Sequence, residues 1–123
     1  MPHNIFIVED HDWVRDMAAR MLEMQPGLSI CGKASSAQAA REAITDECDL
    51  ILIDLGLGEE DGFSLLRDLC HRLPDVPCIV FSGQPAKDFE AAALNAGAAA
   101  YVEKGNAPAL LKAIFDTLGP ADD

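Results

Sequence analysis

Five short apolar runs alternate along the chain with segments in which apolar residues recur every three or four positions. The apolar runs begin near positions 5, 28, 50, 78 and 100. Short apolar runs bounded by turn residues predict strands, and the three-to-four periodicity between them predicts helices. Strictly alternating strands and helices are typical of βα units, so we expect an α/β domain built on a parallel sheet.

The runs differ in polarity, which constrains the order of the strands in that sheet. Residues 5–8, 50–53 and 78–81 are wholly apolar, as expected for strands that are buried on both faces. The runs near 28 and 100 are mixed and carry Lys33 and Lys104, which is typical of edge strands. The order 2-1-3-4-5 with right-handed crossovers satisfies this pattern and predicts a doubly wound, five-stranded sheet.

Several polar residues are predicted to cap the helices. Asp12 is expected to cap the first helix, and Ser35, with Gln38 three residues later, forms a capping-box pattern before the second. Asn106 and Pro108 are expected to begin the last helix.

The fourth helix, before Gly97, offers an apolar face made almost entirely of alanine. Because alanine buries little area, we expect this helix to be the most weakly held.

Composition limits the classes of function. The 123 residues are expected to form a single domain, and the 21 acids against 9 bases give a net charge of −12. This charge argues against direct binding of nucleic acid, and no apolar run is long enough to span a membrane. The four cysteines lack metal-site spacing and are interpreted as reduced packing residues of a cytoplasmic protein: Cys31, Cys48, Cys70 and Cys78.

Three acids follow strands that are neighbours in the predicted order. Glu9 and Asp10 follow the first strand, and Asp54 follows the third. Ligands of open parallel sheets bind outside the carboxyl ends of the strands, where the winding reverses, so the three acids are expected to share one crevice. Clustered carboxylates repel unless a cation joins them, and oxygen ligands with room for water suit Mg²⁺.

Two further polar residues are expected at the same edge of the sheet. Ser82 ends the fourth strand and Lys104 ends the fifth. A metal, a hydroxyl and an ammonium around a carboxylate suit phosphoryl transfer, with Asp54 as the nucleophile that forms an acyl phosphate. Taken singly, Ser82 is equally consistent with a turn residue and Lys104 with a solvated edge lysine.

These features, in this order, resemble the receiver domains of two-component response regulators, which have a flavodoxin-like (βα)5 fold. The resemblance covers essentially the whole chain and is carried by residues 5–11, 50–54, 61–62, 80–83, 97–98 and 101–104. It implies a cytoplasmic signalling domain in which Asp54 accepts a phosphoryl group from a sensor histidine kinase or a histidine phosphotransfer protein. The output is expected to be contact with a downstream protein or a fused output domain.

The resemblance also implies the metal ligands. Asp10 and Asp54 would bind Mg²⁺ directly, Glu9 would act mainly through water, and the backbone carbonyl of Gly56 would complete the protein ligands.

Three further residues would respond to phosphorylation. Lys104 would pair with a carboxylate at rest and with the phosphoryl group afterwards. Ser82 would move toward the phosphoryl group, and Tyr101 would rotate inward into the vacated space. The face formed by helix 4, strand 5 and helix 5 is expected to switch.

Three departures from the family pattern involve glycines. Gly56 and Gly58 stand where receivers often have larger or proline residues, Gly83 stands where alanine is usual, and Gly105 stands where proline is common. The first two departures leave the phosphoryl group less shielded, so we expect an accessible acyl phosphate that hydrolyses quickly.

Two other classes compete with this interpretation. A phosphatase with an aspartyl nucleophile needs a second acid two residues further on, where this chain has Gly56. A flavin carrier needs a Ser/Thr-rich phosphate loop after the first strand, where residues 9–12 are Glu-Asp-His-Asp. We therefore expect a signalling switch whose chemistry is limited to its own phosphorylation and dephosphorylation, rather than an enzyme.

Overall fold

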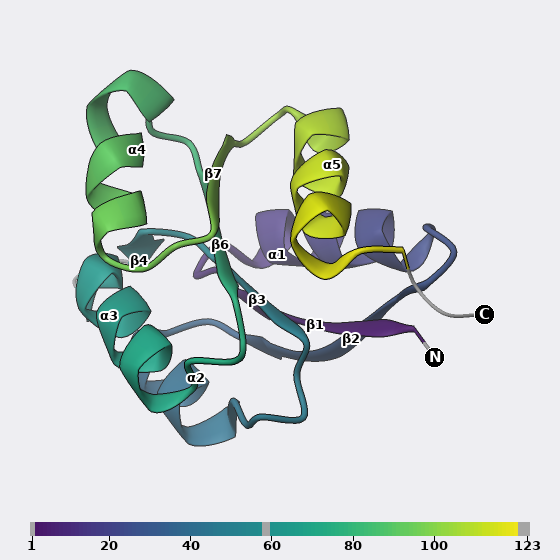
Figure 1. Ribbon diagram of the computed structural model, residues 1–123, viewed down its shortest axis with the longest axis horizontal. Coiled ribbons are helices and arrows are strands. Elements are labelled where there is room, and N and C mark those ends of the chain that lie inside the picture. The colour runs from purple at the N-terminus through teal and green to yellow at the C-terminus, as the bar shows by residue number, and fades with distance from the viewer. Residues whose placement is uncertain (1, 58–59, 121–123) are drawn as a thin grey trace.

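A computed structural model describes residues 2–57 and 60–120 and has a parallel sheet with helices on both faces (Figure 1). The strands of this sheet are β1 (His3–Val8), β2 (Leu28–Ala34), β3 (Leu50–Ile53), β6 (Cys78–Ser82) and β7 (Ala100–Glu103). The helices are α1 (Asp12–Glu23), α2 (Ala37–Ala43), α3 (Gly62–Arg72), α4 (Ala86–Asn95) and α5 (Ala107–Leu118). No helix within the described ranges combines the length and apolar character needed to cross a bilayer.

The strand order is β2-β1-β3-β6-β7, and all neighbouring pairs are parallel. Counted along the chain within this sheet, this is the predicted order 2-1-3-4-5. The mixed strands β2 and β7 occupy the edges as expected, and the apolar strands lie inside. The winding therefore reverses between β1 and β3, the two strands that lead into the acids.

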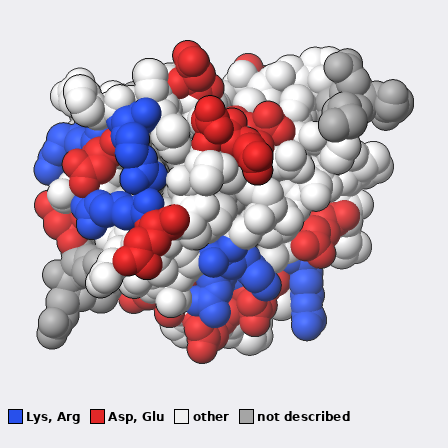
Figure 2. Space-filling view, turned by 90° about the horizontal axis from the view of Figure 1, so that it is seen from below, with Lys and Arg blue, Asp and Glu red and all other residues white. Residues whose placement is uncertain are grey.

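The charged surface mixes both signs. Figure 2 shows Lys and Arg side chains lying next to Asp and Glu side chains on the face seen from below. Ion pairs such as Arg41–Asp68, at 2.8 Å, and Lys33–Asp16, at 3.5 Å, account for part of this mixing.

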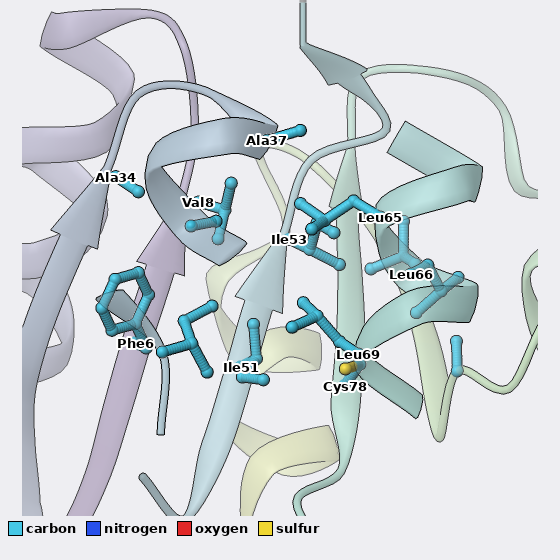
Figure 3. Close-up of a cluster of buried hydrophobic side chains, with 14 of the residues drawn as sticks. Phe6, Val8, Ala34, Ala37, Ile51, Ile53, Leu65, Leu66, Leu69 and Cys78 are labelled. Atoms are coloured by element: carbon cyan, nitrogen blue, oxygen red, sulfur yellow. The ribbon is translucent and has the colours of Figure 1, made fainter. Parts of the chain in front are cut away.

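Alternate residues of the central strands fill two separate cores, one on each face of the sheet. Ile5, Ile7, Leu50 and Leu52 pack toward α1 and α5. The intervening residues pack toward α2, α3 and α4. Figure 3 shows Ile51 and Ile53 on the side of Leu65, Leu66 and Leu69 of α3, with Phe6 and Val8 nearer to Ala34 and Ala37. Burial on both faces explains why these strands are continuous apolar runs.

Two predicted helix caps are displaced by one residue. His11, not Asp12, caps α1: its Nδ1 accepts a hydrogen bond from the backbone N–H of Val14 at 3.4 Å. Asp12 is instead the first helical residue and pairs with Arg15 at 2.7 Å. The position of His11 directly after the acidic pair predicts an exposed spacer. It is exposed, but its ring nitrogen also satisfies an amide at the helix start.

Ser36, rather than Ser35, caps α2 and accepts from the N–H of Ala39 at 3.0 Å. Either serine can form this bond, so the sequence does not distinguish them. The expected cap of α5 is confirmed, because Asn106 accepts from the N–H of Ala109 at 3.2 Å.

The acidic, glycine-punctuated sequence from Gly56 to Gly62 predicts a loop between β3 and α3. Instead, β4 (Gly56–Leu57) and β5 (Glu60–Asp61) form a short antiparallel ladder. Asp61 then caps α3 by accepting from the N–H of Phe63 at 2.9 Å. Gly62 allows this turn, since a Cβ there would lie 2.3 Å from the carbonyl oxygen of Leu55.

Helix α4 is thinly packed, as its alanine-rich sequence predicts. Ala93 is its one buried residue, and Pro85 at its N-cap provides no side-chain hydrogen bond. Its weak attachment remains a prediction about stability, supported by this packing.

Candidate functional site

The acids predicted to converge do so at the carboxyl ends of β1 and β3. The register aligns Val8 with Ile53, so Glu9 and Asp54 leave the sheet side by side. One carboxylate oxygen from each of Glu9, Asp10 and Asp54 lies within 4.8 Å of the other two. Glu9 and Asp54 are only 4% and 7% exposed, whereas Asp10 is exposed. The crevice therefore has a buried floor and an open, acidic rim.

Lys104 reaches this floor from the edge strand. Its Nζ donates to Oε2 of Glu9 at 2.8 Å and to Oδ2 of Asp54 at 3.1 Å. The backbone N–H of Lys104 donates to the carbonyl of Ser82 at 2.7 Å, which holds the end of β7 against β6. One ammonium thus bridges the two buried carboxylates.

The electrostatics follow from burial opposed by this pairing. Burial raises the pKa of Glu9; the hydrogen bond from Lys104 lowers it in part, and the charge of Asp54 raises it again. Burial lowers the pKa of Lys104, but the hydrogen bond to Glu9 and the charges of Asp54 and Glu9 outweigh it, so that pKa is raised. Lys104 is therefore charged at neutral pH. Burial disfavours the charged form mainly at Glu9, whose pKa is raised.

The donor set fits a divalent cation. Three carboxylates face one ammonium, which leaves a net negative charge in the crevice. The donors are all oxygen, and the exposed Asp10 leaves access for water, as Mg²⁺ prefers.

Ser82 and Tyr101 are both buried, at 1% and 8% exposure, and both bond to the backbone of Gln84. The hydroxyl of Ser82 accepts from the N–H of Gln84 at 3.1 Å, and the hydroxyl of Tyr101 donates to its carbonyl at 2.7 Å. The ring of Tyr101 is thus already inside in this structure. The sequence contained no signal for Gln84, because it acts through main-chain atoms.

Two neighbours of Glu9 were also missed from the sequence. The backbone N–H of His11 donates to Oε1 of Glu9 at 3.3 Å, and the guanidinium of Arg15 donates to its carbonyl oxygen at 3.1 Å. These contacts orient Glu9 from the first turn of α1, a relation that no short motif encodes.

The approach to Asp54 is lightly covered. The N–H of Gly56 donates to Oδ1 of Asp54 at 3.2 Å, and a Cβ at Gly56 would lie 3.9 Å from Oδ2. A side chain at this position would therefore contact the carboxylate. A Cβ at Gly83 would meet nothing within 4 Å.

An apolar groove of about 420 Å³ extends from Lys104 along α1. Trp13 and Met17 lie along it and are 68% and 46% exposed. The apolar positions Val14, Met17, Ala18, Met21 and Leu22 recur at helical spacing and predict that Met17 faces inward, which is wrong. Ala18, Ala19 and Leu22 fill the core side of α1, and Met17 lies beside that stripe.

The sheet is open and doubly wound, and its switch point holds an acidic crevice with a lysine. These features define a class of domain that binds a cation and a phosphoryl group. The chain belongs to the response regulator receiver domain family, whose pattern it matches over residues 5–116. It is accordingly a phospho-accepting receiver domain of the two-component type, and the phosphatase alternative is not supported.

Curated relatives include the KDP operon transcriptional regulatory protein KdpE of Escherichia coli, 37% identical over 101 residues. The DNA-binding transcriptional activator DevR/DosR of Mycobacterium tuberculosis is 33% identical over 101 residues. These alignments cover 82% and 81% of this chain but 44% and 46% of the relatives. The chain thus spans about half the length of the curated relatives that it matches.

Solved structures show the same fold. A LuxR-family response regulator from Aurantimonas matches with a TM-score of 0.84 and 28% identity, over 98% of this chain and 88% of that one. A CheY-like receiver domain protein from Methanospirillum hungatei matches with a TM-score of 0.81 and 27% identity, over 96% and 94% of the two chains.

Proposed function

We propose that Asp54 is the acceptor carboxylate and that its donor is the phosphohistidine of a sensor histidine kinase or a histidine phosphotransfer protein. The observation that carries this proposal is the bridge from Lys104 to Glu9 and Asp54 at the switch point of the sheet. Of the two bridged carboxylates, Glu9 has its second oxygen and its backbone carbonyl held from the first turn of α1. Asp54 instead lies beside Gly56, which has no side chain to cover the carboxylate.

In the transfer, a carboxylate oxygen of Asp54 forms a bond to phosphorus while the bond from phosphorus to the donor imidazole nitrogen breaks. Lys104 holds the carboxylate in place before the reaction. Afterwards the ammonium follows the negative charge onto a phosphoryl oxygen, which leaves Glu9 with a weaker partner.

Mg²⁺ fits the rim of this site. Asp10, Asp54 and the carbonyl of Gly56 would hold it, and Glu9 would act mainly through water. The ion would neutralise charge on the phosphoryl oxygens during transfer.

We infer that Ser82 and Tyr101 report phosphorylation through Gln84, to which both are bonded. If the hydroxyl of Ser82 turns to the phosphoryl group, it releases the N–H of Gln84, and the segment that leads into α4 is freed to shift. Phosphorylation would then change the population of two arrangements of the face built from α4, β7 and α5. Backbone NMR shifts confined to this face on adding beryllofluoride would support the switch; unchanged shifts there would contradict it.

The apolar groove along α1 supports docking of the donor protein. It leads to Lys104, and Trp13 and Met17 offer exposed apolar area beside the acceptor. The output partner is a downstream protein or a fused output domain rather than nucleic acid bound by this domain, consistent with its charge of −12. We also propose that the domain is cytoplasmic and that it catalyses no reaction on other substrates.

Acetyl phosphate with Mg²⁺ tests the acceptor directly. Intact-mass measurement should show the gain of one phosphoryl group in the unmodified chain and in an Asp75→Asn control, which removes an exposed acid. The Asp54→Asn variant should show none. Labelling that persists in this variant would place the acceptor elsewhere, and rapid turnover of a phosphate ester would restore the phosphatase alternative.

A further inference from the structure

Two cysteines from different parts of the chain bring their sulfur atoms together beside the edge of the sheet. Cys31 in β2 and Cys48, just before β3, have Sγ atoms 3.0 Å apart, and their thiols share a hydrogen bond. Both are free thiols; Cys31 is exposed and Cys48 is buried. A disulfide bond is about 2.0 Å long, so the sulfurs need to approach by only about 1 Å.

A bulge in β2 produces this approach. β1 pairs Ile5 with Ile30 and Phe6 with Gly32, which leaves Cys31 as an extra residue without a partner in the register. Such a residue bends its strand and redirects its side chain. The ring of Phe6 lies against Gly32, where a Cβ would be 2.5 Å from Cε2, so this space is closed to other side chains.

We propose that Cys31 and Cys48 form a reversible modification site, an intrachain disulfide made by a peroxide-type oxidant. The exposed Cys31 attacks one oxygen of hydrogen peroxide; the O–O bond breaks, and a sulfenic acid and one water result. The sulfur of Cys48 then attacks the sulfenic sulfur, the S–S bond forms, and the S–O bond breaks with release of a second water. The two thiols give up two electrons in total, and a dithiol reductant returns them.

The surroundings of Cys31 slow its oxidation. Desolvation of its sulfur and the hydrogen bond with Cys48 raise the pKa of Cys31 to about 12, so little thiolate is present at neutral pH to react with peroxide. The cross-link would close the segment from Cys31 to Cys48, which contains α2, and tie the edge strand β2 to the start of β3. It therefore restricts the unfolded chain and stabilises the edge of the sheet.

Peptide mapping identifies the bond, because each cysteine lies in its own tryptic peptide: residues 21–33, 42–67, 68–72 and 73–87. The folded chain is treated with hydrogen peroxide, free thiols are alkylated, and the chain is digested. Peptides 21–33 and 42–67 should be linked within a monomer and separate on reduction with dithiothreitol. The melting temperature of the oxidised chain should rise by about 10 °C. Closing even a short loop restricts the unfolded chain, and in a small domain this stabilisation produces a large shift in melting temperature.

Two variants complete the test. Cys31→Ser removes an exposed thiol and should abolish both the linked peptides and the thermal shift. Cys70→Ser, at a half-buried cysteine outside the pair, should retain both. The proposal is overturned if no linked peptides form, if Cys31 pairs with Cys70 or Cys78, if Cys31 joins two copies of the chain, or if the oxidised monomer melts at the same temperature as the reduced one.

Discussion

The bridge made by Lys104 gives the most direct prediction of stability. Lys104→Met keeps most of the apolar side chain and removes the ammonium that bonds to Glu9 at 2.8 Å and to Asp54 at 3.1 Å. Removal of one partner from a buried ion pair costs roughly 3–5 kcal/mol. Because the side chain of Lys104 is 24% exposed and the exposed Asp10 opens the crevice to water, the lower end applies. We expect the free energy of unfolding to fall by about 3 kcal/mol without metal.

Magnesium should reduce this loss. A ligand at ten times its dissociation constant adds about 1.4 kcal/mol to the free energy of unfolding. The variant presents the same acids without the competing ammonium, so it should bind Mg²⁺ more tightly than the unmodified chain and gain more from it. The free energy of unfolding is measured by urea denaturation, followed by far-UV circular dichroism, with EDTA and with Mg²⁺.

Lys112→Met is the matched control. Lys112 pairs with Asp116 on the exposed side of α5, and such a surface pair contributes less than about 0.5 kcal/mol. If Lys104→Met lost no more stability than this control in EDTA, or if Mg²⁺ left its loss unchanged, the proposed electrostatics of the crevice would be wrong.

Three other predictions address single features. Burial raises the pKa of Glu9 above 4.5, so the folded chain holds this proton more tightly than the unfolded chain, and the free energy of unfolding without metal should fall as pH rises from 4.5 through the raised pKa. Urea denaturation in EDTA at several pH values should show a weaker fall for the Glu9→Gln variant. An identical pH profile in the two proteins would contradict this prediction. Gly97→Ala should lower the free energy of unfolding by about 2 kcal/mol in the same assay, because Gly97 has φ +116° and a Cβ there would lie 2.7 Å from Sγ of Cys70. The control Gly83→Ala should change this free energy little, and equal effects of the two substitutions would contradict the prediction. Gly56→Asn should lengthen the lifetime of the acyl phosphate severalfold by covering the carboxylate, as measured by phosphate release, and an unchanged rate would show that access at Gly56 does not limit hydrolysis.

The sheet could be predicted because the polarity of each strand reports its position. Wholly apolar runs identified the inner strands, and the lysines in the runs near 28 and 100 identified the edges. The helix caps were less certain, because neighbouring polar residues such as His11 and Asp12 can satisfy the same amides. The predicted burial of Met17 in α1 was also wrong. Where a helix has a wide apolar stripe, helical spacing does not show which residues at the margin of the stripe are exposed.

The acids of the site could be predicted because each directly follows a strand, and strand order then fixes which ends meet. Lys104 was found in the same way, because it follows the last strand and reaches Glu9 and Asp54. The role of Ser82 stays a prediction. Gln84 and Arg15 were missed because they act through a main-chain group and through the geometry of a helix turn. The contact between Cys31 and Cys48 was missed because it depends on a bulge, and the alternation of residues along a strand does not predict where an extra residue lies.

The exposed position of Trp13 determines how this protein can be studied by fluorescence. It is the chain's single tryptophan, and the residue is 68% exposed in the folded state. Its emission should therefore change little when the chain unfolds, which makes it a poor monitor of denaturation. The same ring lines the groove that reaches Lys104, so a donor protein that docks there should shield it from quenchers such as acrylamide. The unlabelled domain thus carries its own optical probe for the encounter with its donor.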